Sequence, residues 1–198
     1  MKNVVLTLVL FVTSFVGKAQ DGIAVGSKAP GFTAKDQNGK TINLATALKK
    51  GKVVIIFYRG NWCPNCTREL SNIQDSLSLF REQNITVIGI GPETVTGIKK
   101  TVEKTQASFP VISDKGLKIM KNYKVAFTIT DDMDEVHKKY NIDVAANNGT
   151  NGNTLPRPSA FIINQEGIII YRYLNNSPYS DANSNNRITV KEILEKAK

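Results

Sequence analysis

Side chains that bind soft metal ions are scarce in this chain of 198 residues. It has two cysteines, Cys63 and Cys66, and a single histidine, His137. Tetrahedral zinc needs four ligands, more than these three side chains supply, which argues against a structural zinc site. The three side chains together would suit copper(I), which leaves a copper-binding chaperone as a weaker alternative. His137 lies among Asp, Glu and Lys, so we expect it to be solvated.

The low cysteine count also argues against a disulfide-stapled domain. Such domains normally carry four or more cysteines. A bridge between Cys63 and Cys66 would close a very short loop and remove little entropy from the unfolded chain. A purely structural role is therefore a poor explanation of the pair.

Long apolar runs are absent except at the N-terminus. Residues 4–16 are apolar apart from Thr and Ser, Lys2 precedes them, and Gly17-Lys18-Ala19 supplies small residues at a cleavage site. We expect a signal peptide over 1–19, cut after Ala19, and one exported domain, periplasmic or secreted, over 20–198. A membrane anchor is the alternative, but a span needs roughly 20 apolar residues.

Negative charge is in the minority, since 26 Lys and Arg face 17 Asp and Glu, for a formal net charge of +9. The basic residues are scattered and form no stripe interleaved with aromatic residues. This pattern indicates a solvated basic surface, and we expect no nucleic-acid partner.

Strand and helix patterns alternate along the chain. Residues 32–44 predict a hairpin around Asn38-Gly39, while the β-branched runs 53–57 and 85–91 predict strands buried on both faces. Amphipathic helices follow these strands, the first reaching about Glu82. Residues 160–173 predict a second hairpin before a last helix. The expected fold is α/β, with a mixed central sheet flanked by helices.

A shorter strand, two short helices and two loops complete this prediction. The expected strand is 109–114, the helices cover KGLKIMKNY and DDMDEVHKKY, and the loops include 145–154 and the polar stretch NNSPYSDANSNN. Asp131 or Asp132 is the expected N-cap of the second short helix.

The two cysteines come at the start of the helix that follows strand 53–57. Pro64 favours the first helical position, which places Cys63 at the N-cap. Unpaired N–H groups and the helix dipole would then lower the pKa of its thiol from about 8.5. Cys66 follows three residues later on the same helix face, within disulfide reach. Cys63 is the expected attacking thiol and Cys66 the resolving thiol.

Trp62 immediately precedes the pair. Its ring would cover the sulfur or offer a flat docking surface, and ordinary core packing is an equally good interpretation.

The stretch VVIIFYRGNWCPNC resembles AhpC/TSA-type peroxiredoxin-like proteins of the thioredoxin superfamily, in a subgroup with the pattern FYRGxWCPxC. FPVISD and TLPRPSAFIINQEGIIIYRY extend the resemblance over residues 24–173. It implies a thioredoxin-like fold with an N-terminal β-hairpin and an inserted helical and loop segment. A cis-proline strand follows that segment. Pro158 matches the cis-proline, and Arg157 would flank the site.

The sequence also departs from this family. Typical peroxiredoxins carry Pro-x-x-x-Thr-x-x-Cys around the reactive thiol, whereas Arg59 and Gly60 lie four and three residues before Cys63. The CxxC spacing is similar to that of exported TlpA/ResA-like reductases. In those proteins an acid lies near the CxxC, a position that Glu93 matches. Glu93 would take the proton of Cys66, or would simply be an acid at a helix start.

The resemblance therefore implies an exported antioxidant oxidoreductase that needs neither a cofactor nor a metal. Its substrate would be a hydroperoxide or a protein disulfide, and a thioredoxin-like dithiol would re-reduce it. Arg59, Trp62, Pro64, Glu93, Arg157 and Pro158 would shape the site. A TlpA/ResA-like thiol-disulfide oxidoreductase with no peroxidase role is the alternative.

Overall fold

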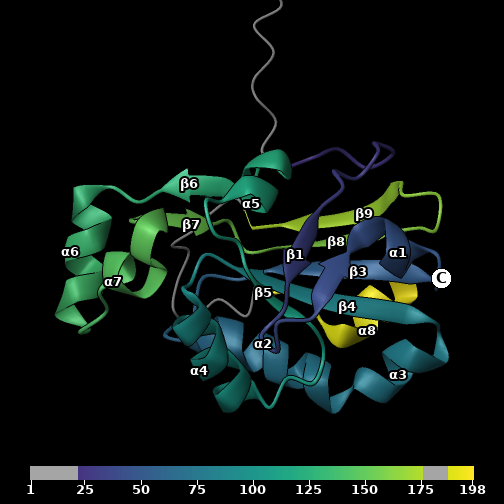
Figure 1. Ribbon diagram of the computed structural model, residues 1–198, viewed down its shortest axis with the longest axis horizontal. Coiled ribbons are helices and arrows are strands. Elements are labelled where there is room, and N and C mark those ends of the chain that lie inside the picture. Colours follow the sequence, from purple (N-terminus) through teal and green to yellow (C-terminus); the bar gives the residue numbers. More distant parts are fainter. Residues whose placement is uncertain (1–21, 176–186) are drawn as a thin grey trace, which may run out of the picture.

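The computed structural model describes residues 22–175 and 187–198 (Figure 1). The predicted signal peptide and most of the NNSPYSDANSNN loop lie outside these residues. The strands are β1 (Thr33–Lys35), β2 (Thr41–Asn43), β3 (Lys52–Phe57), β4 (Ile85–Gly91), β5 (Val111–Ser113), β6 (Ala126–Thr128), β7 (Thr154–Pro156), β8 (Ser159–Ile163) and β9 (Ile169–Leu174). The helices are α1 (Leu44–Leu48), α2 (Pro64–Asp75), α3 (Leu77–Glu82), α4 (Val95–Thr105), α5 (Lys118–Asn122), α6 (Asp131–Lys139), α7 (Val144–Asn148), the 3-10 turn η1 (Gly149–Asn151) and α8 (Val190–Lys196).

A five-stranded mixed sheet in the order β5-β4-β3-β8-β9 forms the centre of the molecule. Strands β3, β4 and β5 run parallel, and β8 and β9 are antiparallel to their neighbours. Side chains alternate between the two faces of β3, and a hydrophobic core covers each face. Val54 and Ile56 face one core, and Val53, Ile55 and Phe57 face the other.

Helices cover both faces of this sheet (Figure 1). The first core lies under α2, α3, α4 and α8, and the second lies under α1, α5 and the β1–β2 hairpin. The expected mixed sheet between helical layers is confirmed, as are the hairpin around Asn38-Gly39 and the buried strands at 53–57 and 85–91.

One helix prediction was wrong in its length. The helix expected to reach Glu82 ends at Asp75, and a second begins at Leu77, because Ser76 leaves helical geometry at φ −104° and ψ 12°. Leu77 and Phe80 remain buried after the break. The apolar spacing therefore identified the buried face but not the interruption.

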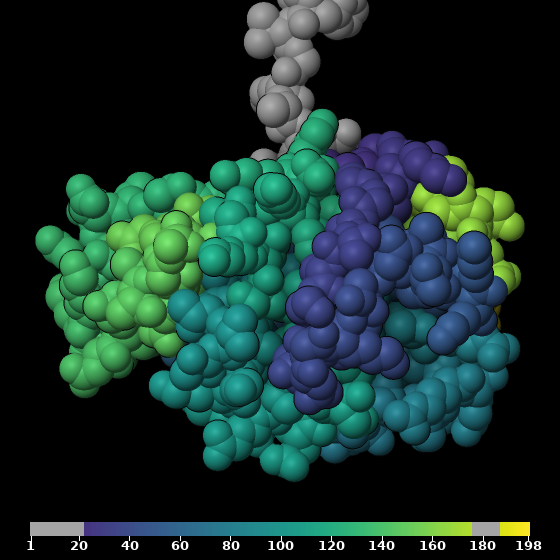
Figure 2. All heavy atoms as spheres, viewed as in Figure 1, coloured from purple at the N-terminus to yellow at the C-terminus, as the bar shows by residue number. Residues whose placement is uncertain are grey.

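The segment inserted before β8 contains more regular structure than the sequence predicted. Strands β6 and β7 pair antiparallel, and the expected loop at 145–154 holds α7 and η1. The side chain of Asp143 accepts a hydrogen bond from Ala146 N and so caps α7. The N-cap of α6 is Thr130, one residue before the expected aspartates. Figure 2 shows this part of the chain, in green, projecting beside the main body.

None of the described helices is long and apolar enough to cross a membrane.

Candidate active site

Helix α2 begins as predicted, with Cys63 at its N-cap and Pro64 as its first residue. The backbone N–H of Cys66 points at Cys63 Sγ at 3.4 Å. Strand β3 ends at Phe57, and the turn formed by residues 60–63 connects it to the helix, with Cys63 N donating to Gly60 O at 3.0 Å. The sulfur of Cys63 therefore lies at the electropositive end of a 12-residue helix.

Cys63 and Cys66 form a disulfide, with their Cα atoms 5.3 Å apart. Both residues are buried, with exposed fractions of 1% and 0%. They pack with Val54, Ile56 and Leu70 in the first core. A reagent in solution has no direct path to either sulfur in this state, so an attack on the disulfide requires a local movement.

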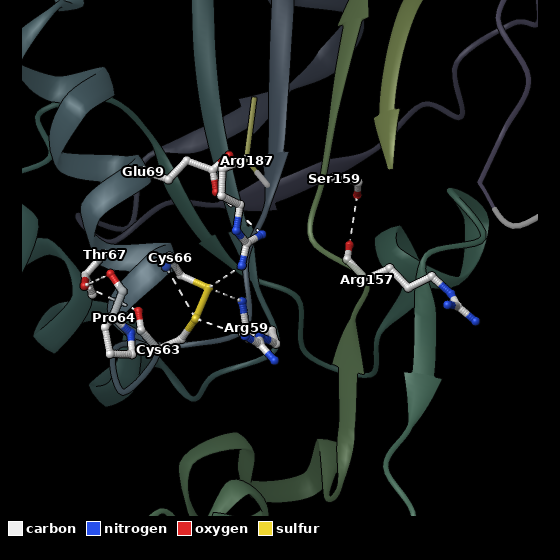
Figure 3. A network of polar contacts seen from close by, with 9 residues as sticks. All are labelled: Arg59, Cys63, Pro64, Cys66, Thr67, Glu69, Arg157, Ser159 and Arg187. Atoms are coloured by element: carbon white, nitrogen blue, oxygen red, sulfur yellow. Dashed lines mark hydrogen bonds and ion pairs between the residues drawn. A yellow bond between two sulfur atoms is a disulfide. The ribbon is translucent and has the colours of Figure 1, made fainter. Parts of the chain in front are cut away.

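Two arginines approach the sulfur atoms from the side opposite α2 (Figure 3). A guanidinium nitrogen of Arg59 lies 3.5 Å from Cys63 Sγ, and the Arg59 backbone N–H points at Cys66 Sγ at the same distance. Arg187, which precedes α8, places a guanidinium nitrogen 3.7 Å from Cys66 Sγ. Each sulfur therefore has a cationic neighbour that would stabilise a thiolate.

Glu69 lies behind Arg187, one turn along α2 from Cys66. Its carboxylate is 3.8 Å from the Arg187 guanidinium, and its side chain is only 6% exposed. Burial raises the pKa of Glu69 to about 7, although the charge of Arg187 partly opposes that shift. The carboxyl therefore titrates near neutral pH beside the cation that faces Cys66.

Trp62 packs between the first core and a small cluster on the inserted segment, formed by Ile129, Val144 and Leu155. Its ring is 5.1 Å from that of His137, edge to face, and the Arg59 guanidinium lies 5.8 Å from its centroid. Both sequence interpretations of Trp62 thus have a structural counterpart, since it packs into a core and also borders the cysteines.

His137 is 6% exposed, so the expectation of a solvated histidine was wrong. Its ring lies against Trp62, and its Nδ1 is 2.8 Å from the carbonyl of Met133 one turn earlier in α6. Burial lowers the pKa of His137, partly opposed by that hydrogen bond. Within residues 22–175 and 187–198, no three His, Cys, Asp or Glu side chains gather in a group able to hold a metal ion. The copper set of Cys63, Cys66 and His137 is therefore not assembled.

Glu93 is fully buried just before α4. One carboxylate oxygen accepts hydrogen bonds from the backbone and side chain of Asn61, and the other accepts one from Thr101 Oγ1 at 2.7 Å. Thr94 takes the N-cap of α4. Glu93 thus contacts the turn that leads into Cys63.

Pro158 does not have the expected cis bond, because the described part of the chain contains no cis peptide. The trans bond fits a direct passage from β7 into β8. Arg157 N donates to Val125 O at 2.8 Å, and Pro158 O accepts from Asn175 N at 3.0 Å. The backbone on each side of this peptide bond therefore stays extended and hydrogen-bonded to an adjacent segment. The trans form of an X–Pro bond is also favoured by about 0.5–1 kcal/mol.

The side chain of Arg157 points away from the cysteines (Figure 3). Its guanidinium lies 5.6 Å from the ring centroid of Phe127 in β6. Strand β8, which begins directly after Pro158, pairs with β3 beside the site, as expected. Arg157, however, is directed toward the inserted segment.

The model of the AhpC/TSA family matches residues 25–172. The chain belongs to the AhpC/TSA family. It is 29% identical over 154 residues to chloroplastic peroxiredoxin Q of Triticum aestivum, which covers 77% of this chain and 60% of that protein. It is 32% identical over 107 residues to the thiol-disulfide oxidoreductase ResA of Bacillus cereus, over 54% of this chain and 61% of that protein.

The chain thus spans about 60% of the length of these relatives. Solved structures of the same fold include peroxidoxin BcpB of Mycobacterium tuberculosis, with a TM-score of 0.61 at 21% identity, covering 76% of this chain and 84% of that one. A peroxiredoxin 6 mutant of Arenicola marina gives a TM-score of 0.67 at 16% identity, covering 87% and 71%. The thioredoxin-like α/β fold of the AhpC/TSA family is therefore confirmed.

Three residues near the cysteines of this AhpC/TSA protein were missed from the sequence. Glu69 follows Cys66 by three residues, so helical spacing would have placed it on the same face. Asn61 lies two residues before Cys63, but nothing in its surroundings indicated a buried partner. Arg187 is distant in the chain and carries no local signal.

Proposed function

We propose that this protein is an exported thiol-based oxidoreductase that cycles between a Cys63–Cys66 dithiol and the corresponding disulfide. The observation that carries the proposal is the position of Cys63 at the N-cap of α2, with Cys66 within bonding reach. The family membership and the relatives named peroxiredoxin Q and ResA support the same chemistry.

In the reduced protein, the Cys63 thiolate attacks one oxygen of a hydroperoxide. The O–O bond breaks, an alcohol or water leaves, and Cys63 becomes a sulfenic acid. The Cys66 thiolate then attacks that sulfur and water is released as the disulfide forms. With a disulfide substrate, Cys63 forms a mixed disulfide and expels one thiolate, and Cys66 expels the other.

Both routes take two electrons from the protein thiols. A thioredoxin-like dithiol partner returns them by the reverse exchange, and no cofactor enters the cycle.

The surroundings of the sulfurs support this division of roles. Cys63 has the helix N-terminus, the Cys66 N–H and the Arg59 guanidinium on its side. Once the disulfide is reduced, these groups would favour its thiolate. Arg187 and the Arg59 N–H would stabilise the Cys66 thiolate that resolves the intermediate.

A second candidate is a ResA-like reductase that does not use peroxide. It is favoured by Gly60, which lies three residues before Cys63, where typical peroxiredoxins carry a threonine. That position therefore supplies no hydroxyl to a peroxide. Rapid mixing of the reduced protein with hydrogen peroxide separates the two functions. Thiol loss far faster than that of free cysteine supports the peroxidase, and thiol loss at the rate of free cysteine supports the reductase.

Trapping experiments test the assignment of the two cysteines. Cys66→Ser should accumulate mixed disulfides with a substrate disulfide, because Cys63 attacks and nothing resolves the product. Cys63→Ser should abolish turnover and trap little. Equal trapping by the two variants would contradict the proposed roles.

Export is part of the proposal and rests on residues 1–19. Expression in a Gram-negative host should yield a periplasmic protein whose N-terminal residue is Gln20. An intact N-terminus on protein recovered from the cytoplasm would overturn this part.

A further inference from the structure

Asn61 lies in the turn that leads into the cysteines, and it is held from two sides. Its backbone N–H and side-chain amide both donate to Glu93 Oε1, at 2.8 and 2.5 Å. Lys104 Nζ donates to Asn61 O at 2.9 Å and lies 3.3 Å from its Oδ1. Glu93 precedes α4 and Lys104 lies in its last turn. One residue of the turn is therefore bound to a carboxylate and an ammonium group from the same helical segment.

The position of Glu93 is well defined. Its side chain is fully buried, and Thr101 Oγ1 binds its second oxygen at 2.7 Å. An added Cβ at Gly97 would lie 2.8 Å from Glu93 Cβ and 3.1 Å from Glu93 Oε1. Gly97 thus leaves the space that Glu93 occupies. The carboxylate of Glu93, which only accepts hydrogen bonds, receives them from three donors.

Tyr58 is an ionisable group beside Glu93. Burial, and then the charge of Glu93, raise the pKa of Tyr58 far enough that its hydroxyl stays neutral. Cys66 Sγ instead faces the N–H groups of Arg59 and Arg187. The carboxylate of Glu93 is thus directed at the turn that carries Cys63.

We propose that Glu93 and Lys104 are positioning residues for Cys63, which hold the 60–63 turn through Asn61 and so keep the sulfur at the N-terminus of α2. This inference rests on the proposed function, because it concerns the same thiol. It replaces proton transfer from Cys66 as the role of Glu93. A charge-assisted hydrogen bond is about twice as strong as a neutral one, which suits a fixed turn.

Two substitutions of Glu93 separate positioning from proton transfer. Glu93→Gln keeps an oxygen for the Asn61 donors, and its amide can donate to Thr101 Oγ1, which then accepts. Glu93→Ala removes both contacts. Each is placed in the Cys66→Ser background, and the ionisation of Cys63 is followed by thiolate ultraviolet absorbance. We expect Glu93→Ala to raise the pKa of Cys63 by about one unit, a tenfold loss of acidity, and Glu93→Gln to change it little.

Turnover provides the second readout, with Cys66 restored. Glu93→Gln should keep most of the turnover rate and the same pH profile. Glu93→Ala should lose most of the rate and change the pH profile. Equal losses of turnover in the two variants would mean that Glu93 transfers a proton. Unchanged turnover in both would mean that Glu93 has no role in the site. Either result would overturn the proposal.

Lys104→Met tests the same turn from the surface and serves if Glu93→Ala fails to fold. Lys100→Met, an exposed lysine of the same helix, is the matched control. Only Lys104→Met should raise the pKa of Cys63. An unchanged value would overturn the role of Lys104. Since Cys63 ionisation is measured without substrate, a wild-type protein that turns over neither peroxide nor disulfide would refute the proposed function while leaving this result intact.

Discussion

Glu69 is a buried carboxyl whose pKa lies near neutrality, and this has a consequence for stability. Its pKa is raised from 4.5 to about 7 in the folded protein, so the folded state binds more protons than the unfolded state between these values. Stability should therefore fall as the pH rises from 4.5 to 7. Glu69→Gln should remove this dependence and add about 1 to 3 kcal/mol at pH 8.

Urea unfolding of the two proteins across this pH range measures the effect. The difference between them isolates Glu69 from other titrating groups. A difference that does not change with pH would contradict the assigned pKa. The variant also leaves Arg187 beside Cys66 without an ionised carboxylate, so its redox behaviour is worth recording in the same samples.

Gly60 provides the space for the indole of Trp62. A Cβ at this position would lie 2.5 Å from Trp62 Nε1 and 2.9 Å from its Cδ1. Gly60→Ala should displace the ring at a cost of about 1–3 kcal/mol. Trp62 is the only tryptophan in the chain, so its emission spectrum reports the change directly. An unshifted spectrum with unchanged stability would show that the ring does not need this space.

At the scale of elements, the start of β3 lies very close to the start of β4. An added Cβ at Gly51 would meet Asn84 O at 1.8 Å, and that atom belongs to the backbone. Gly51→Ala must therefore move one strand relative to the other and should lower the stability by more than about 2 kcal/mol. Gly31→Ala is the control, because nothing lies within 4 Å of its Cβ position. Equal thermal midpoints for the two variants would contradict this close approach.

Helix α6 contacts the site through His137 and Trp62. The pKa of His137 is lowered from 6.5, mainly by burial, so the folded state binds its proton less readily than the unfolded state. The stability contributed by neutral His137 is complete above pH 6.5 and is lost as the pH falls below it. The protection of α6 against hydrogen exchange, taken relative to the intrinsic exchange rate at each pH, should therefore fall below pH 6.5, and His137→Gln should abolish this fall. Protection of α6 that does not change with pH in the wild type would contradict it.

The sequence predicted elements well where a local rule decides the outcome. Pro64 after Cys63 placed the start of α2, and Asn38-Gly39 placed the hairpin turn. The break at Ser76 was missed because the apolar spacing continues across it. The helix at 144–148 was missed because its sequence is polar. In the second case the stability comes from capping by Asp143 and from the amide of Asn148, which bonds Gly152 and Thr154 carbonyls.

At the scale of the whole molecule, the family resemblance placed the right strand beside the cysteines but the wrong isomer at Pro158. Strand order follows from the alternation of strands and helices, whereas the contacts of Arg187, Glu93 and Lys104 depend on packing between distant segments. No spacing in the chain predicts Arg187 or Lys104, whereas the family resemblance pointed to Glu93 as an acid near the CxxC. The sequence thus identifies the thiols together with Arg59 and Glu93, and the tertiary structure adds Arg187 and Lys104.

Both sulfurs are buried in the oxidised protein, so its reduction should depend on a movement near Trp62 and Arg59. The cycle itself is tested most directly by equilibrating the protein with glutathione buffers of graded potential, followed by alkylation and mass analysis. We predict a single two-electron transition in which Cys63 and Cys66 lose their reactivity together in a monomeric product. Thiols that remain independent, or that oxidise only between molecules, would contradict the account.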